Sequence, residues 1–195
     1  IRTLNEDYSN QGLQGFDLQG KTLGIIGVGR IGLHVIRIAR GFGMKVKAFD
    51  IHQDHFISEI MHFEYGTLDE ILKTCDVISL HMPHNKNTHH FLDEEKLSKT
   101  KKGVIIINTS RGQLIKNEAL YKYLENGHIF GAGLDVLDGE ELIKSEEELM
   151  KNSDSSKEIQ EVFRDKKMLK MENVIFTPHN AFNSVEAVQR ILDTT

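Results

Sequence analysis

Residues 22–50 constrain the fold of this chain more than any other stretch, because they place a glycine pattern between two short apolar runs. The first run covers residues 23–26, and Gly27-x-Gly29-x-x-Gly32 follows it directly. A helical pattern and a second apolar run come next. Strand, glycine turn, helix and strand in this order are typical of a βαβ unit that binds a dinucleotide. An isolated glycine pattern would fit an ordinary βαβ turn equally well, but the flanking elements favour the binding site.

Each glycine of this pattern has its own physical task. Gly27 permits the tight turn out of the strand, Gly29 lets a pyrophosphate approach the backbone, and Gly32 lets the helix pack close to the sheet. Asp50 ends the second apolar run, where a carboxylate can accept hydrogen bonds from ribose hydroxyls and repel a 2′-phosphate. No Arg or Lys follows Asp50 directly, so the predicted cofactor is NAD rather than NADP.

Strand and helix patterns alternate along most of the remaining chain. Beyond Asp50 we expect helices at residues 68–74, 93–99, 117–126 and 184–192, and strands at residues 76–81, 104–108, 129–136 and 174–177. Continuous apolar strands are typical of a parallel sheet that is covered on both faces. The predicted fold class is therefore α/β, a doubly wound, mostly parallel sheet of the Rossmann type.

The expected domain organisation is simple. Residues 21–195 form one NAD-binding domain, and the polar residues 1–20 form a connecting segment. The stretch 138–172 is rich in Glu, Asp, Lys and Ser, and we expect a surface insertion there with one or two amphipathic helices. The chain begins at Ile1 and ends in an incomplete helical pattern, which predicts a fragment of a longer protein.

Composition argues against several classes of partner. The net charge is −5 and no basic block is present, which argues against nucleic acid. No apolar run reaches membrane-spanning length and no signal peptide is visible, so no membrane association is expected. The sole cysteine, Cys75, suits a reducing cytoplasm, where we expect the protein to reside. Because Cys75 precedes an apolar run, a buried structural residue is favoured over a catalytic thiol.

Polar residues follow three of the expected strands. They are Asn-Thr-Ser-Arg-Gly at 108–112, the segment 133–140, and Thr-Pro-His-Asn-Ala at 177–181. The carboxyl ends of parallel strands meet at one edge of a sheet, and ligands gather there. We therefore expect these segments to lie together beside a bound nicotinamide.

Five runs carry a resemblance to a known family: GKTLGIIGVGRIG, DVISLHMP, GVIIINTSRG, GAGLDV and NVIFTPHNAF. In order and spacing they resemble the NAD-binding domain of the D-isomer-specific 2-hydroxyacid dehydrogenases, most of all the D-lactate dehydrogenase branch. The resemblance implies that Arg111 holds the carboxylate and keto oxygen of the substrate through its planar fork of donors. It implies that His179 exchanges the proton with the substrate oxygen, and that Glu140 orients His179 and stabilises its protonated form.

The same resemblance implies contacts with the cofactor. Besides the glycines and Asp50, the backbone of Arg30 and Ile31 corresponds to positions at the pyrophosphate. The remaining implied contacts are Met82, Pro83 and Thr88 beside the adenosine, and Thr109, Ser110, Arg111, Asp135 and His179 near the nicotinamide. For Asp135 a purely structural role, closing a turn at the strand end, is the alternative.

Two features depart from the family pattern. Glu141-Leu142 stands where many relatives have a proline soon after the glutamate, and residues 138–172 lengthen the connection between Glu140 and His179. Asp138 and Glu141 are therefore alternative carboxylate partners for His179.

The resemblance implies a homodimeric enzyme that interconverts a D-2-hydroxy acid and its 2-keto acid with NAD. A D-3-phosphoglycerate dehydrogenase-like enzyme and an NAD-sensing corepressor remain alternatives, because the corepressors keep this catalytic set and phosphate-binding residues would lie mostly outside this chain. An isolated fragment is expected to bind NAD(H) without efficient turnover. No metal site is predicted, because metal ligation by His84, His89 and His90 would need converging geometry and usually acids or thiols. A solvated loop is expected for these three histidines.

Overall fold

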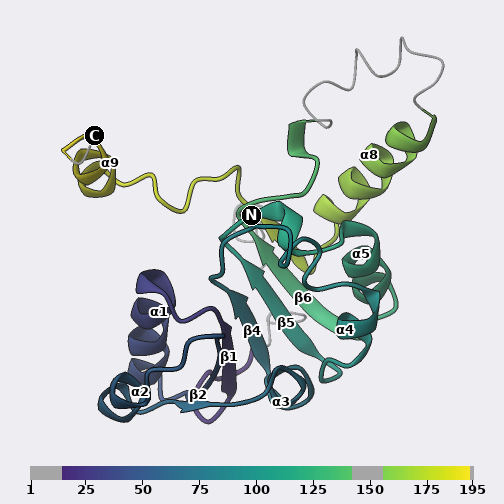
Figure 1. The fold of residues 1–195 in the computed structure, drawn as a ribbon. Coiled ribbons are helices and arrows are strands. Elements are labelled where there is room, and N and C mark those ends of the chain that lie inside the picture. The colour runs from purple at the N-terminus through teal and green to yellow at the C-terminus, as the bar shows by residue number, and fades with distance from the viewer. Residues whose placement is uncertain (1–14, 142–155, 194–195) are drawn as a thin grey trace, which may run out of the picture.

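Seven parallel strands form one sheet in the computed structural model, which describes residues 15–141 and 156–193 (Figure 1). The strand order is β3-β2-β1-β4-β5-β6-β7, and each neighbouring pair runs parallel. The strands are β1 Thr22–Ile26, β2 Lys45–Phe49, β3 Glu64–Tyr65, β4 Val77–Leu80, β5 Val104–Asn108, β6 Ile129–Leu134 and β7 Val174–Phe176. This order confirms the doubly wound Rossmann-type fold, with every described strand parallel.

Side chains cap four of the described helices, which are α2 (His55–Met61), α3 (Leu68–Thr74), α4 (Glu94–Ser98) and α9 (Val185–Leu192). Thr67 forms a capping box with Glu70 at the start of α3, and Asp54, Asp93 and Ser184 cap α2, α4 and α9. The helices whose bounds the structure describes are α1 Arg30–Gly41, α2 His55–Met61, α3 Leu68–Thr74, α4 Glu94–Ser98, α5 Asn117–Glu125, α8 Ser156–Leu169 and α9 Val185–Leu192, with a 3-10 turn, η2, at Gly112–Leu114.

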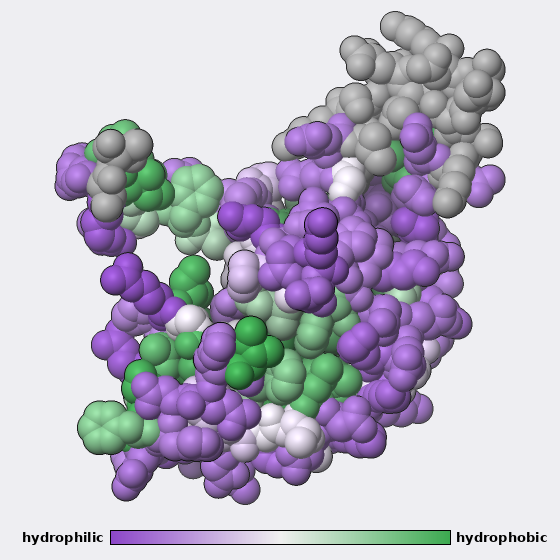
Figure 2. Space-filling view, in the orientation of Figure 1, coloured by the Kyte–Doolittle hydropathy of each residue, from purple (hydrophilic) through white to green (hydrophobic). Residues whose placement is uncertain are grey.

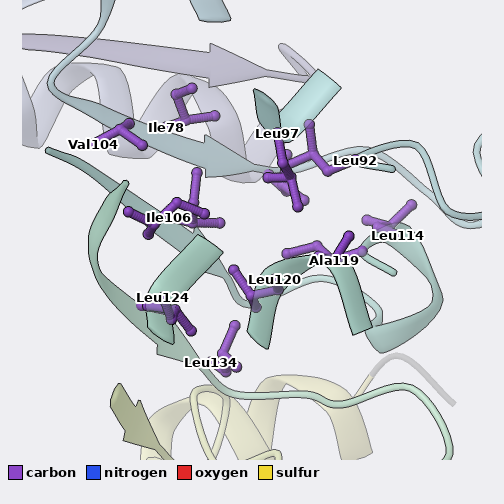
Figure 3. Close-up of a cluster of buried hydrophobic side chains, with 14 of the residues drawn as sticks. Ile78, Leu92, Leu97, Val104, Ile106, Leu114, Ala119, Leu120, Leu124 and Leu134 are labelled. Carbon is purple, nitrogen blue, oxygen red and sulfur yellow. The ribbon is translucent and has the colours of Figure 1, made fainter. Parts of the chain in front are cut away.

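Helices cover one face of the sheet over β4 to β6 and the other face over β1 and β2, and a cluster of buried apolar side chains fills each interface. On one face, strands β4 to β6 pack against α3, α4, α5 and α8; Figure 3 shows this cluster around Ile106 and Leu120. On the other face, β1 and β2 pack against α1 and α2. The neighbours Ile25 and Ile26 belong to different clusters, and both are fully buried. Because β1 is covered on both faces, its apolar residues follow one another without alternation. On β5 to β7 one face is buried, and Ile105, Ile107, Phe130 and Ile175 on the other face are half-buried or exposed.

Within the predicted insertion the structure describes residues 138–141 and 156–172, and α8 forms most of the second stretch. This helix packs against α5 and buries Val162 and Met168, while Phe163 on its outer side is 73% exposed. The expected amphipathic helix is thus confirmed for its residues. Positions 142–155 of the insertion lie outside the described residues, as do residues 1–14 of the expected connecting segment.

The sequence prediction is wrong between residues 51 and 67, where it assigned no element. The structure has α2 and the two-residue edge strand β3 there. A strand this short carries no alternating pattern, so periodicity could not reveal it. Strands β4 and β6 are also shorter than expected, because His81 and Val136 already belong to loops at the carboxyl edge of the sheet.

The C-terminal helix α9 stands apart from the sheet, at the end of an extended segment that follows β7 (Figure 1). Its apolar side chains are exposed, as the green atoms at the upper left of Figure 2 show, and Val185 is 84% exposed.

Among the described helices, none combines the length and the apolar character that crossing a membrane requires.

Candidate active site

Gly27 and Gly32 are required by packing, whether or not a ligand is bound. Gly27 has a φ of +99°, and a Cβ there would lie 2.7 Å from the backbone of His81 and Met82. A Cβ on Gly32 would lie 2.3 Å from the carbonyl oxygen of Gly27. The glycine loop is therefore pressed against both the end of β4 and the first turn of α1, as the sequence predicts.

Gly29 differs from its two neighbours in the pattern, because no described atom lies within 4 Å of the position that a Cβ would take. It is the N-cap of α1 and provides no side-chain cap, and the first turn of α1 has no acidic residue. Arg30 and Ile31 follow, both exposed. The open space and the unpaired amide groups at this helix N-terminus fit the pyrophosphate of a dinucleotide.

The carboxylate of Asp50 lies between the end of β2 and the glycine loop. Its Oδ2 accepts a hydrogen bond from the Val28 amide at 2.6 Å, and its Oδ1 accepts one from the His52 amide at 2.9 Å. Each carboxylate oxygen has two acceptor sites, so both can accept a further hydrogen bond from a ribose hydroxyl. Asp50 thus fits its predicted role and also braces the loop.

His81 lies at the end of β4, beneath this loop, and the sequence analysis assigned it no role. Its Nε2 is 2.9 Å from Ser79 Oγ, and its buried Nδ1 has no hydrogen-bond partner among the described residues. Burial lowers the pKa of the imidazole to about 4. The folded protein therefore holds His81 neutral at physiological pH.

This burial predicts a specific loss of stability in mild acid. The unfolded chain binds a proton at His81 below about pH 6.5, whereas the folded chain resists it down to about pH 4. Stability should therefore fall by about 3 kcal/mol as the pH drops through this window. Urea unfolding at pH 7, 6 and 5 measures the slope, and His81→Phe should flatten it. Equal slopes in both proteins would refute this assignment.

The loop after β4 holds the residues expected beside the adenosine. Met82 packs against the core, and Pro83 is exposed. The Thr88 hydroxyl donates to the Pro83 carbonyl at 2.8 Å and accepts from the Asn85 amide at 2.7 Å. Thr88 thus shapes this loop, and its contact with the cofactor stays a prediction.

A buried amide shapes the loop that carries Arg111. Asn108, 1% exposed at the end of β5, accepts from the Ser110 amide at 3.1 Å and donates to the Arg111 carbonyl at 2.9 Å. The Ser110 hydroxyl donates to the Leu80 carbonyl on β4 at 2.8 Å. Thr109 and the guanidinium of Arg111 remain exposed. The role of Asn108 was not predicted from the sequence, although a polar residue closing an apolar strand was the available signal.

Asp135 anchors the loop that carries His179. It is 3% exposed, and its carboxylate accepts hydrogen bonds from the Thr177 hydroxyl, the Asn180 amide at 2.8 Å and the Ala181 amide at 3.0 Å. Burial would raise the pKa of this carboxyl, but these hydrogen bonds outweigh it and hold the pKa below its ordinary value. The structural role is therefore present, and a contact with the nicotinamide stays a prediction.

His179 itself has a left-handed backbone, with a φ of +49°, and an exposed ring. Its amide donates to the Asp135 carbonyl at 2.8 Å, and its ring meets Phe182 edge-on at 5.6 Å between centroids. A non-glycine residue in this conformation is uncommon and is held by its surroundings. Here the anchored loop directs the imidazole outward.

The three predicted catalytic residues line one cleft of about 580 Å³. Arg111, Glu140 and His179 follow the adjacent strands β5, β6 and β7, at the edge of the sheet where the sequence places them. Gly112 makes this possible, because a Cβ there would lie 2.1 Å from the Leu137 backbone. The cleft is also lined by Gln113, Val136, Asp138, Gly139, Glu141 and Pro178.

The clustered histidines lie in the loop before α4. His84 Nε2 is 3.2 Å from His89 Nδ1, and the rings of His89 and His90 stack with centroids 3.9 Å apart. Within the described parts of the chain, no group of three or more His, Cys, Asp or Glu side chains could hold a metal ion. Cys75 is fully buried, and burial raises the pKa of its thiol to about 11, which suits the expected structural role.

Comparison with known proteins agrees with this geometry. Residues 2–181 match the family model described as D-isomer specific 2-hydroxyacid dehydrogenase, NAD binding domain. Over 195 residues the chain is 40% identical to the D-lactate dehydrogenase of Escherichia coli, covering 100% of this chain and 56% of that protein. It is 39% identical to the glyoxylate reductase of Korarchaeum cryptofilum over 180 residues, or 92% of this chain and 48% of that protein.

A solved structure gives the same result. The D-lactate dehydrogenase of Aquifex aeolicus, complexed with NAD and lactic acid, superposes with a TM-score of 0.83 at 38% identity, covering 99% of this chain and 56% of that one. The chain spans about half the length of the curated relatives it matches. It belongs to the D-isomer-specific 2-hydroxyacid dehydrogenase family and carries that family's NAD-binding domain.

Proposed function

We propose that this chain is the cofactor-binding part of an enzyme that interconverts a D-2-hydroxy acid and its 2-keto acid. The cleft lined by Arg111, Glu140 and His179 supports this proposal most directly. It brings a fixed cation, an acid and an imidazole to the edge of the sheet where the glycine loop also lies. Bound NAD(H) would supply or accept the hydride at this edge.

Arg111 positions the substrate. One of its guanidinium N–H groups donates to the Ser110 carbonyl at 2.7 Å, which orients the planar group. The guanidinium can then offer paired donors to the carboxylate and keto oxygen of a 2-keto acid. The positive charge also stabilises negative charge that develops on the keto oxygen.

His179 exchanges the proton. Its imidazole donates a proton to the keto oxygen during reduction and accepts the hydroxyl proton in the reverse direction. A carboxylate beside it orients the ring and stabilises the protonated form. Among the acids of the cleft, Glu140 takes the position that the family resemblance assigns to this task, Glu141 is the alternative, and Asp138 accepts a hydrogen bond from His90.

The substrate pair that we propose first is D-lactate and pyruvate, because D-lactate dehydrogenases are among the chain's relatives in both sequence and fold. A relative of similar identity is a glyoxylate reductase, so the choice of acid needs measurement. A steady-state screen of pyruvate, glyoxylate, hydroxypyruvate and 3-phosphohydroxypyruvate with NADH, on the intact protein with its native flanking sequence, tests the proposal.

Each outcome of this screen has a meaning. Fast reduction of pyruvate supports the proposal, and a preference for 3-phosphohydroxypyruvate points to a D-3-phosphoglycerate dehydrogenase-like enzyme. Tight NADH binding without turnover of any acid contradicts the enzyme and favours an NAD-sensing protein. The 195-residue chain alone is expected to bind NADH with little turnover, and robust turnover would contradict this expectation.

Asp50→Ala is expected to weaken NADH binding by about 10- to 100-fold, the range for hydrogen bonds that involve a charged group. It should also narrow the gap between NADH and NADPH, because the carboxylate no longer repels a 2′-phosphate. Fluorescence titration with both cofactors measures this change. Glu59→Ala, which removes an equal charge from the exposed side of α2, is the control. An unchanged ratio of the two affinities would contradict the role of Asp50.

A homodimer in the cytoplasm is the assembly and location that we propose. The family resemblance supports the homodimer, and exposed apolar side chains at Phe16, Phe130 and Ile175 are compatible with it. The single buried thiol of Cys75 suits a reducing compartment. Light scattering should give twice the mass of one chain, and a monomer would contradict the proposal.

A further inference from the structure

His90 joins the two loops that carry Arg111 and Glu140. Its backbone amide donates to the Gln113 carbonyl at 2.7 Å, just after Arg111 in the chain. Its imidazole Nε2 lies 2.8 Å from Asp138 Oδ2, just before Glu140. One residue, from a loop far away in sequence, thus contacts both sides of the cleft.

The backbone of His90 is held in an uncommon conformation. Its φ is +48°, and the other non-glycine residues with positive φ among those described are His62 and His179. Such a conformation is unfavourable for a residue other than glycine and persists where surrounding contacts enforce it. Adjacent segments of the same chain provide these contacts. The Leu92 amide donates to the Leu114 carbonyl and so continues the backbone pairing that begins at His90.

Asp138 is held from three sides. His90 binds its carboxylate, the Asn117 side chain donates to its carbonyl at 2.9 Å, and Gly112 packs directly against its amide. Only Gly139 separates Asp138 from Glu140. The position of the Glu140 backbone therefore depends on how firmly Asp138 is held.

Charged groups surround the His90 ring on several elements. A pocket of about 220 Å³ beside it is lined by Lys116, Glu118, Asp138, Glu161, Arg164 and Asp165, and His89 stacks on its other side. The hydrogen bond to Asp138 does not need a charged imidazole, because Nε2 carries a proton in one neutral tautomer and in the cation. A neutral side chain that carries an N–H donor at a similar distance from the backbone can therefore replace the imidazole.

We propose that His90 is a positioning residue, which holds the Arg111 loop and the Glu140 loop at the separation that the reaction needs. The proposal rests on the function proposed above. His90 lines the pocket next to the cleft, and its hydrogen bonds go to Gln113 and Asp138 rather than to the glycine loop. Its loss should therefore impair the handling of the keto acid and spare the binding of NADH.

The test compares His90→Leu, which keeps bulk but removes the donor, with His90→Gln, which restores an N–H donor. In the intact protein, His90→Leu should lower kcat/KM for the best 2-keto acid by roughly 10- to 100-fold, since a misplacement of about 1 Å can cost that much. NADH affinity should change less than twofold. His90→Gln should recover most of the lost kcat/KM. Adding Asp138→Ala to His90→Leu should lower kcat/KM little further, because both replacements remove the same hydrogen bond.

His62→Leu is the matched control, because it makes the same replacement at a left-handed position, with a φ of +55°, at the end of α2. It should leave kcat/KM unchanged. If His62→Leu lowers it as much as His90→Leu does, or if His90→Leu has no effect, the proposal is overturned. Loss of NADH binding and of thermal stability in parallel with activity would also overturn it, by showing a general structural role.

A binding measurement separates this proposal from the proposed function. Oxamate, an amide analogue of pyruvate, is titrated into the NADH complex of each variant. Weaker oxamate binding by His90→Leu, rescued by His90→Gln, supports the positioning role. If this result is obtained but no acid is turned over, the proposed reaction is refuted and the positioning role still stands. Equal oxamate affinity in wild type and His90→Leu contradicts the positioning role, whatever the turnover.

Discussion

Replacement of His179 by glutamine is expected to lower the maximal rate of keto-acid reduction by about 10²- to 10⁴-fold, the range that general acid–base catalysis contributes. The ring is exposed and lines the cleft with Arg111, so it can reach a bound substrate. Glutamine can hydrogen-bond to the keto oxygen but cannot exchange a proton with it near neutral pH. Steady-state kinetics of the intact protein measure the rate, and fluorescence titration measures NADH affinity, which should remain nearly unchanged.

His62→Gln is the control for this variant, since both histidines have a left-handed backbone, with φ of +55° and +49°. The control should keep full activity. Unchanged turnover in His179→Gln would refute its role as the proton donor. A large loss of NADH affinity would instead assign His179 to the binding of the cofactor.

Replacement of Gly29 by alanine is expected to weaken NADH binding by at least about tenfold, or about 1.4 kcal/mol, while leaving the fold intact. The φ of Gly29 is −81°, which suits alanine, and no described atom lies within 4 Å of the new methyl position. The methyl group would therefore meet the approaching pyrophosphate and little else. Its cost in stability should be about 1 kcal/mol or less.

Gly32→Ala is the matched comparison with the opposite expectation. Its methyl group would lie 2.3 Å from the Gly27 carbonyl oxygen, so α1 and the loop would have to move apart. Overpacking of this kind costs about 1–3 kcal/mol of stability. Urea unfolding and NADH titration of both variants separate the two effects. Wild-type affinity in Gly29→Ala would show that the pyrophosphate does not approach this backbone.

The contrast between these glycines shows which features of the site the sequence could predict. The spacing of Gly27, Gly29 and Gly32 predicted three different tasks, and the structure agrees with the two that depend on packing within the chain. These tasks were predictable because each follows from local geometry, a strand that turns sharply into a helix. The same local logic predicted that the loops after β5, β6 and β7 meet at one edge, which the strand order confirms.

Residues that act through distant partners could not be predicted in the same way. The Asn108 side chain bridges backbone groups of its own loop. Its two hydrogen bonds are shielded from water because folding buries it, and the local sequence does not show this burial. The structural role of Asp135 was one of two possibilities, and the structure shows its carboxylate bound to the loop of His179. His90 was expected in a solvated loop, whereas its ring contacts Asp138 in the pocket next to the cleft.

The fold class and the cofactor site follow from patterns that span a few residues each, because periodicity and glycine spacing report the local backbone. The shape of the cleft does not, because it depends on how close separate loops come. Gly112 against Leu137, and His90 against Asp138, are contacts between segments that only folding brings together. Their energies depend on distances of a few tenths of an ångström, which residue order does not encode locally.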